Sequence, residues 1–125
     1  MRIQRLHTDN RMSQIVIHRD TVYLAGQVGE DMAAGIEQQT LETLQEIEKL
    51  LAQAGSDKQH ILSVTIYLKD IARDFAGMNA VWDRWLPEGV APARATVEAG
   101  MCESEILVEM SVVAALPEIT RPDNL

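Results

Sequence analysis

The stretch EILVEMSVVAAL, residues 105–116, decides the fold, because its regular alternation predicts a long β-strand. One face of this strand is apolar throughout: Ile106, Val108, Met110, Val112, Ala114 and Leu116. The opposite face mixes polar with apolar side chains: Leu107, Glu109, Ser111, Val113 and Ala115. A sheet face that is open to solvent is usually polar. We therefore expect the helices of the chain to cover the first face and another copy of the chain to cover the second.

The residues before this strand predict four further elements and one partner strand. They are a β-hairpin at 13–26, a helix at 36–55, a strand at 60–70, a helix at 74–89 that ends at Leu86-Pro87, and a strand at 93–99. A turn at 100–103 would join 93–99 to 105–116 as a second hairpin. The order β-hairpin, helix, strand, helix, β-hairpin predicts an α+β fold, with two helices packed on one face of a mixed β-sheet.

Hydrophobic periodicity predicts which residues of these elements face the core. The first helix would use Ile36, Leu44, Ile47, Leu51 and Ala54, widened by Leu41 and Leu50. The second helix would use Phe75, Met78, Trp82 and Trp85. The strand between the helices would use Leu62, Val64, Ile66 and Leu68.

Length and composition narrow the class of protein. The 125 residues predict a single domain, 1–125, with a hydrophobic content of 46%. The formal net charge of −8 argues against nucleic acid and acidic lipid surfaces as partners. Cys102 is the only cysteine, and neither a signal peptide nor an apolar membrane span is visible. These features lead us to expect a cytoplasmic protein that binds no membrane.

Arg94 stands among small residues in APARATVEAG, residues 91–100. If 93–99 and 105–116 formed a hairpin, Arg94 would lie opposite Glu109, and a slip of one residue would place it opposite Val108 or Met110. A structural ion pair at a subunit interface is one interpretation. The other is a guanidinium that awaits the carboxylate of a ligand, while Glu109 orients the guanidinium or a water molecule.

The remaining candidates carry weaker signals. The three histidines, His7, His18 and His60, have no spacing typical of a metal site. Cys102 falls in an expected turn without an activating neighbour, and no serine lies in a nucleophile-elbow motif. The spacing of Trp82 and Trp85 favours the core or an interface over stacking on a ligand.

Four segments together resemble the RidA/YjgF family of reactive intermediate deaminases, whose relatives also carry the name endoribonuclease L-PSP. These segments are RMSQIVIHRDTVYLAGQV, SVTIYLKDIARDFAGMNAVWDRW, APARATVEAG and ILVEMSVVAA. The resemblance implies a chorismate-mutase-like fold and a homotrimer with its sites between subunits. It also implies hydrolysis of 2-imino or 2-enamino acids to 2-keto acids and ammonia, without a metal or an organic cofactor.

The resemblance also implies roles for individual residues. Arg94 would bind the substrate carboxylate and Glu109 would position water, with Asn79 and the backbone of Gly26 lining the pocket. The sequence departs from the family pattern at three further pocket positions: Ala25 replaces a serine, Met12 a tyrosine and Thr96 a cysteine.

Two alternatives to a deaminase follow from the same residues. A regulatory trimer could bind a small carboxylate in the same cleft without turnover. A ribonuclease is disfavoured by the net charge of −8 and the lack of a catalytic histidine pair.

Overall fold

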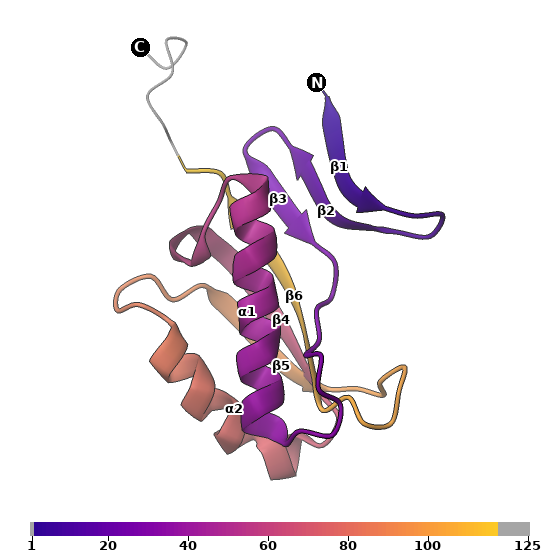
Figure 1. Cartoon of the computed structure of the whole chain (residues 1–125). Helices are drawn as coiled ribbons and strands as arrows, with labels where there is room; N and C mark the ends of the chain where they lie inside the picture. The colour runs from indigo at the N-terminus through magenta and orange to yellow at the C-terminus, as the bar shows by residue number, and fades with distance from the viewer. Residues whose placement is uncertain (1, 118–125) are drawn as a thin grey trace.

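The computed structural model describes residues 2–117 and contains one six-stranded sheet with two long helices on the same face (Figure 1). Its elements are β1 Ile3–Thr8, β2 Ser13–His18, β3 Thr21–Leu24, α1 Ile36–Ala54, the short 3-10 helix η1 Lys58–His60, β4 Ile61–Leu68, α2 Ile71–Trp85, β5 Ala93–Glu98 and β6 Val108–Ala115. The predicted α+β class, with two helices packed on one face of a mixed sheet, is confirmed.

The position of β6 in the sheet differs from the prediction. The strand order is β1-β2-β3-β6-β4-β5, so β6 pairs antiparallel with both β3 and β4. The predicted hairpin of 93–99 with 105–116 is therefore wrong, because β4 lies between these strands. Helix α2 returns the chain to the end of the sheet where β4 began, which makes β5 parallel to β4.

An additional strand extends the sheet beyond the predicted first hairpin. This strand is β1, which pairs antiparallel with β2. The sequence pattern predicts no strand at the residues of β1. Five of its six residues are exposed and only Leu6 packs against the core, so its sequence shows little of the alternation that marks a buried strand. Pairing with β2 completes this edge of the sheet.

The core lies between the sheet and the helices, where the predicted stripes mostly meet. The inward residues of the last strand and the segment before it are buried as predicted: Ile106, Val108, Met110, Val112 and Ala114. In α1 the buried apolar residues are Leu44, Ile47, Leu50 and Leu51. The prediction that Leu41 widens that stripe is wrong: Leu41 is exposed, because it lines a surface groove with Val81 and Trp85 of α2.

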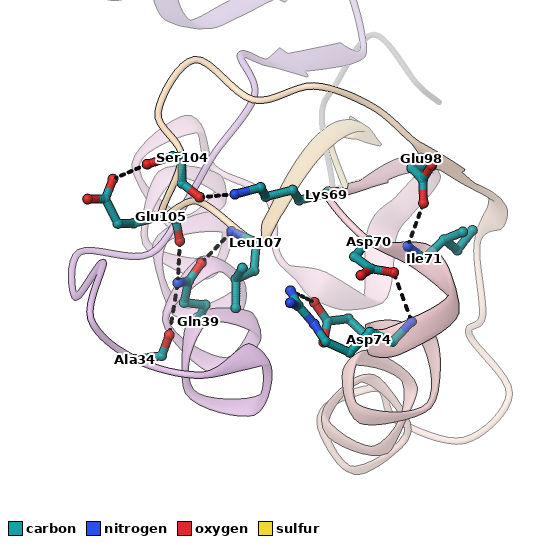
Figure 2. Close-up of polar contacts among 11 residues, drawn as sticks. Ala34, Gln39, Lys69, Asp70, Ile71, Asp74, Glu98, Ser104, Glu105 and Leu107 are labelled. Atoms are coloured by element: carbon teal, nitrogen blue, oxygen red, sulfur yellow. Dashed lines mark hydrogen bonds and ion pairs between the residues drawn. The ribbon is translucent and has the colours of Figure 1, made fainter.

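Helix α2 begins earlier than predicted and turns a slightly different face to the core. Asp70 caps its first turn by accepting a hydrogen bond from the backbone N–H of Arg73 (3.1 Å). Met78 and Trp82 are buried as predicted, whereas Phe75 is 42% exposed. The carboxylate of Asp74 is buried instead, and it binds the Arg73 guanidinium (Figure 2).

A register shift in β4 changes one core position. The pairing with β6 is irregular between Ile61 and Ser63, so Ile61 points into the core and Leu62 is 51% exposed. The prediction that Leu62 faces the core is therefore wrong. A β-bulge inserts one residue into the alternation of β4. A strict period of two, counted back from Val64, therefore places Leu62 in the core, where Ile61 lies.

Residues 2–117 leave the face of the sheet opposite the helices uncovered. It exposes large apolar side chains from three different strands, including Ile3 (46%), Tyr23 (45%) and Val97 (43%). Val113 of β6 lies on the same face, next to Tyr23. Within residues 2–117, no helix is both long and apolar enough to cross a membrane.

Candidate functional site

Arg94 projects from the helix-bearing side of edge strand β5. Its register partner in β4 is Val64, which faces the core, and residues paired across a sheet share a face. The Arg94 Nη1 atom donates a hydrogen bond to Asn79 Oδ1 of α2 (2.8 Å). The Arg94 Cζ atom also lies over the Trp82 ring, 5.3 Å from its centroid. Two residues one helical turn apart on α2 thus hold this guanidinium.

The charge of Arg94 is not neutralised within the described part of the chain. Four ion pairs occur among residues 2–117, and none includes Arg94. Arg73 provides the contrast, because it forms two hydrogen bonds with Asp74, and this carboxylate raises the pKa of the Arg73 guanidinium. Arg94 is exposed and keeps donors free for an anion.

Thr96 and Glu98 follow Arg94 on the same side of β5. Thr96 Oγ1 is buried and has no hydrogen-bond partner among residues 2–117. Glu98 Oε1 accepts a hydrogen bond from the backbone N–H of Ile71 (3.0 Å) and so ties β5 to the start of α2 (Figure 2). Glu98 therefore has a structural contact of its own.

Glu109 projects from the opposite face of the sheet. It pairs with Tyr67 of β4, whose side chain alternates away from the buried Ile66 and Leu68. The predicted position of Glu109 directly across from Arg94 is therefore wrong. The Glu109 carboxylate lies against Gly26: a Cβ atom at position 26 would be only 2.1 Å from Glu109 Oε2. The missing side chain of Gly26 is what makes room for this carboxylate.

The segment around Gly26 is fixed beside β6 by backbone pairing. The Ala25 N–H donates to the Gln14 carbonyl of β2 (2.9 Å), and Gln27 exchanges two backbone hydrogen bonds with Met110. Met12 lies in the β1–β2 turn with its side chain 43% exposed. Its backbone N–H donates to Asp9 Oδ1 (2.9 Å).

The predicted site residues thus form two groups within one chain. Arg94, Asn79 and Thr96 belong to the helix-bearing side of the sheet, whereas Glu109 and Gly26 meet at the open face. The first group offers donors for an anion such as a carboxylate, and the second offers a carboxylate that can accept a hydrogen bond from water. One chain does not turn both groups toward the same ligand.

Sequence reasoning missed the contact between Trp82 and Arg94. The spacing of Trp82 predicts a place in the core or at an interface, and this residue is only 6% exposed. The available signal was its spacing from Asn79, since residues three apart on a helix share a face. That signal needed the tertiary packing of α2 on β5 to become informative.

No group of three or more His, Cys, Asp or Glu side chains in the described residues could hold a metal ion. Two of the histidines instead contact single neighbours: His7 Nε2 is paired with Gln53 Oε1, and His60 Nδ1 with Asp57 Oδ1. Cys102 is exposed in the segment between β5 and β6.

The fold and this arrangement define a small α+β protein with an exposed, unneutralised arginine at the edge of its sheet. The family model described as "Endoribonuclease L-PSP" matches residues 2–116. The chain therefore belongs to this family, whose members also carry the names YjgF and RutC.

Individual relatives cover almost the whole chain. The RutC family protein YoaB of Escherichia coli K12 is 43% identical over 116 residues, which are 93% of this chain and 100% of that protein. A YjgF family member from Neisseria meningitidis has a solved structure similar to this one, with a TM-score of 0.91, 39% identity, and coverage of 95% of this chain and 98% of that chain. A protein from Pseudomonas aeruginosa gives a TM-score of 0.88 at 43% identity, over 91% of this chain and 98% of that chain.

Proposed function

We propose that this protein hydrolyses reactive 2-imino or 2-enamino acids to 2-keto acids and ammonia. Arg94 binds the substrate carboxylate and Glu109 positions the attacking water. The observation that carries this proposal is the state of Arg94: Asn79 and Trp82 hold the guanidinium, yet no carboxylate within residues 2–117 forms an ion pair with it. A permanently charged planar donor of this kind suits a carboxylate ligand.

The proposed reaction requires only water and proton transfer. A 2-enamino acid first becomes the 2-imino acid, as a proton moves from nitrogen to C3. Water then adds to the C=N carbon and forms a carbinolamine; the C–N bond breaks, ammonia leaves, and the C=O bond of the keto acid forms. An imine carbon is already electrophilic, so orientation of the two reactants supplies much of the acceleration. Glu109 accepts a hydrogen bond from the water and thereby directs a lone pair of the water oxygen toward the imine carbon.

We further propose that the complete site forms between subunits of a homotrimer. Arg94 and Glu109 lie on opposite faces of the sheet in one chain, so a ligand that touches both needs them from different chains. The exposed apolar side chains of the open face, among them Tyr23 and Val97, suit burial against a second copy. Thr96, Ala25 and Met12 would line the same cleft.

The first test is a coupled assay in which an amino-acid oxidase generates 2-imino acids and the formation of keto acid is followed. The wild-type protein should accelerate this step, and Arg94→Ala should abolish the acceleration. Arg84→Ala is the matched control, because Arg84 is an exposed arginine on α2 without a role in the proposed site. Equal rates for wild type and Arg94→Ala would overturn the proposal.

Mixing two inactive variants tests the shared site. If each site combines Arg94 of one subunit with Glu109 of another, co-refolding Arg94→Ala with Glu109→Ala restores about a quarter of the sites in randomly mixed oligomers. Sedimentation should show a trimer for the wild type. A mixture with no more activity than its two components would contradict a site shared between subunits.

A second function uses the same cleft without turnover, as a sensor of small carboxylates. Ala25 favours it, because a methyl group stands beside Gly26 where active deaminases usually carry a hydroxyl. Thermal stabilisation by 2-ketobutyrate or benzoate without hydrolysis would select this function.

The net charge of −8 disfavours RNA as the ligand, and the exposed free Cys102 supports a cytoplasmic location.

A further inference from the structure

We propose that Trp82 is a positioning residue, whose indole face fixes the Arg94 guanidinium in the orientation that receives a carboxylate. This inference rests on the proposed role of Arg94 as the carboxylate anchor. The Arg94 Cζ atom lies 5.3 Å from the centroid of the Trp82 ring, within the range of a cation–π interaction. Trp82 is only 6% exposed, so the contact is partly shielded from water, which strengthens it.

Two different contacts restrict the guanidinium. Asn79 Oδ1 accepts a hydrogen bond from Nη1 (2.8 Å), which restrains one nitrogen. The Trp82 ring lies beneath the central carbon. Neither contact is with an anion, so both restrict the rotation of Arg94 without neutralising its charge. A guanidinium that is already ordered loses less conformational entropy when a carboxylate binds.

Further contacts hold the Trp82 ring itself. The centroids of Trp82 and Trp85 are 5.6 Å apart at an interplanar angle of 47°. Lys58 Nζ lies 5.1 Å from the centroid of Trp85 and donates to its backbone carbonyl (2.8 Å). Glu48 of α1 accepts a hydrogen bond from Trp85 Nε1 and lies 3.6 Å from Lys58 Nζ. A continuous row therefore runs Arg94–Trp82–Trp85–Lys58, from β5 across α2 to η1.

A purely structural role for Trp82 makes different predictions. Trp82 belongs to the hydrophobic core, so any truncation lowers stability. A positioning role depends on the aromatic face, which Trp82→Phe keeps and Trp82→Leu removes. We expect Trp82→Leu to weaken carboxylate binding and raise KM about tenfold with little change in kcat, whereas Trp82→Phe should stay within about threefold of wild type. Phe75→Leu, an exposed aromatic on the same helix, should leave both constants unchanged.

The experiment combines calorimetric titration with benzoate, steady-state kinetics and thermal melting for these variants. Equal dissociation constants for the wild type, Trp82→Leu and Trp82→Phe would overturn the positioning role. If Arg94→Ala binds benzoate as tightly as the wild type does, the proposed anchor itself fails. Loss of binding in Arg94→Ala together with unchanged binding in Trp82→Leu would reject only the role of Trp82.

A fluorescence measurement stays informative even if Trp82→Leu does not fold. The sequence contains two tryptophans, so Trp85→Phe leaves Trp82 as the sole reporter. A carboxylate that binds Arg94 changes the charge next to this indole, and titration with 2-ketobutyrate should shift its emission in a saturable way. The double variant Trp85→Phe/Arg94→Ala should show no such shift. A saturable shift of equal size in the double variant would contradict the contact. The contact would also be contradicted if calorimetry showed that Trp85→Phe binds 2-ketobutyrate but its emission did not shift.

Discussion

Arg94 and Glu109 project from opposite faces of the same sheet, separated by strand β4. Arg94 is aligned with Val64 and Glu109 with Tyr67, and these β4 residues differ by an odd number of positions. Because side chains alternate along a strand, the two charges point away from each other. They cannot form an ion pair inside one chain, which leaves the guanidinium available to an external carboxylate.

Gly26→Ala should reduce activity with little loss of stability. The added Cβ would lie 2.1 Å from Glu109 Oε2, so the carboxylate must move, and it can because it ends a flexible side chain. We expect the turnover rate in the coupled assay to fall about tenfold or more. Gly100→Ala is the control, since a Cβ atom at position 100 would have no described atom within 4 Å outside its two chain neighbours. Unchanged turnover in Gly26→Ala would argue against a role for the position of Glu109.

Thr96→Val should stabilise the protein. The Thr96 hydroxyl is buried without a partner in the described part of the chain, and an unsatisfied buried polar group costs about 1–3 kcal/mol. Replacing the hydroxyl by a methyl group removes this cost at similar volume, so the free energy of unfolding should rise by about 1 kcal/mol. Urea denaturation at a fixed protein concentration measures the change. A decrease would mean that the hydroxyl has a partner in the assembled protein.

Gln39→Leu should destabilise the connection between the loop before α1 and the segment before β6. The buried Gln39 amide donates to the carbonyls of Ala34 (3.0 Å) and Glu105 (2.9 Å) and accepts from the Leu107 N–H (2.9 Å; Figure 2). Leucine would leave these backbone groups unpaired, at a cost of about 2–4 kcal/mol.

Denaturation and hydrogen exchange check this expectation together. The Leu107 amide should exchange faster in Gln39→Leu, while amides in the centre of β6 keep their protection. Gln38→Leu is the control, because Gln38 is exposed and its side chain donates a hydrogen bond to Glu42 on its own helix, with no other side-chain hydrogen bond among residues 2–117. Equal loss of stability in both variants would show that the three backbone contacts of Gln39 are unimportant.

Acid should lower stability by protonating two surface carboxylates, those of Asp9 and Glu42, which accept hydrogen bonds from backbone N–H groups. Backbone N–H groups of Arg11 and Met12 lower the pKa of Asp9 below its usual 3.8, and the N–H of Asp31, followed by the Gln38 amide, lowers the pKa of Glu42 below 4.5. A lowered folded pKa contributes stability that is present above the unfolded value and lost as pH falls through the folded value. Unfolding free energy should therefore drop as the pH falls below 4.5 for Glu42 and below 3.8 for Asp9.

The variants Asp9→Asn and Glu42→Gln isolate this effect. Each removes one carboxylate whose pKa is lower in the folded than in the unfolded state, so each should make the loss of stability at acid pH less steep. Glu88→Gln is a control for the loss of one exposed carboxylate without such backbone contacts. An identical pH profile for wild type and Asp9→Asn would contradict the contribution of Asp9.

Periodicity predicted the elements well where a single face is buried. The alternation of Val108, Met110 and Val112 and the helical spacing of Leu44, Ile47 and Leu51 all point into the core. These patterns succeed because burial of one face forces a fixed repeat. Leu62 and Phe75 were misplaced for local reasons, a bulge in β4 and a buried, Arg73-paired Asp74 in α2, which no repeat reveals.

The sequence by itself determined the two helices, the strands that line the core, and the residue types of the candidate site. The family resemblance in its motifs agrees with the match over residues 2–116. Only the tertiary structure decided that β4 separates β5 from β6, and therefore that Arg94 turns toward Asn79 and Trp82 while Glu109 turns toward Gly26. Alternation within a strand is a local property of the backbone. Strand order is set by the crossover through α2 and by long-range pairing, which local periodicity does not encode.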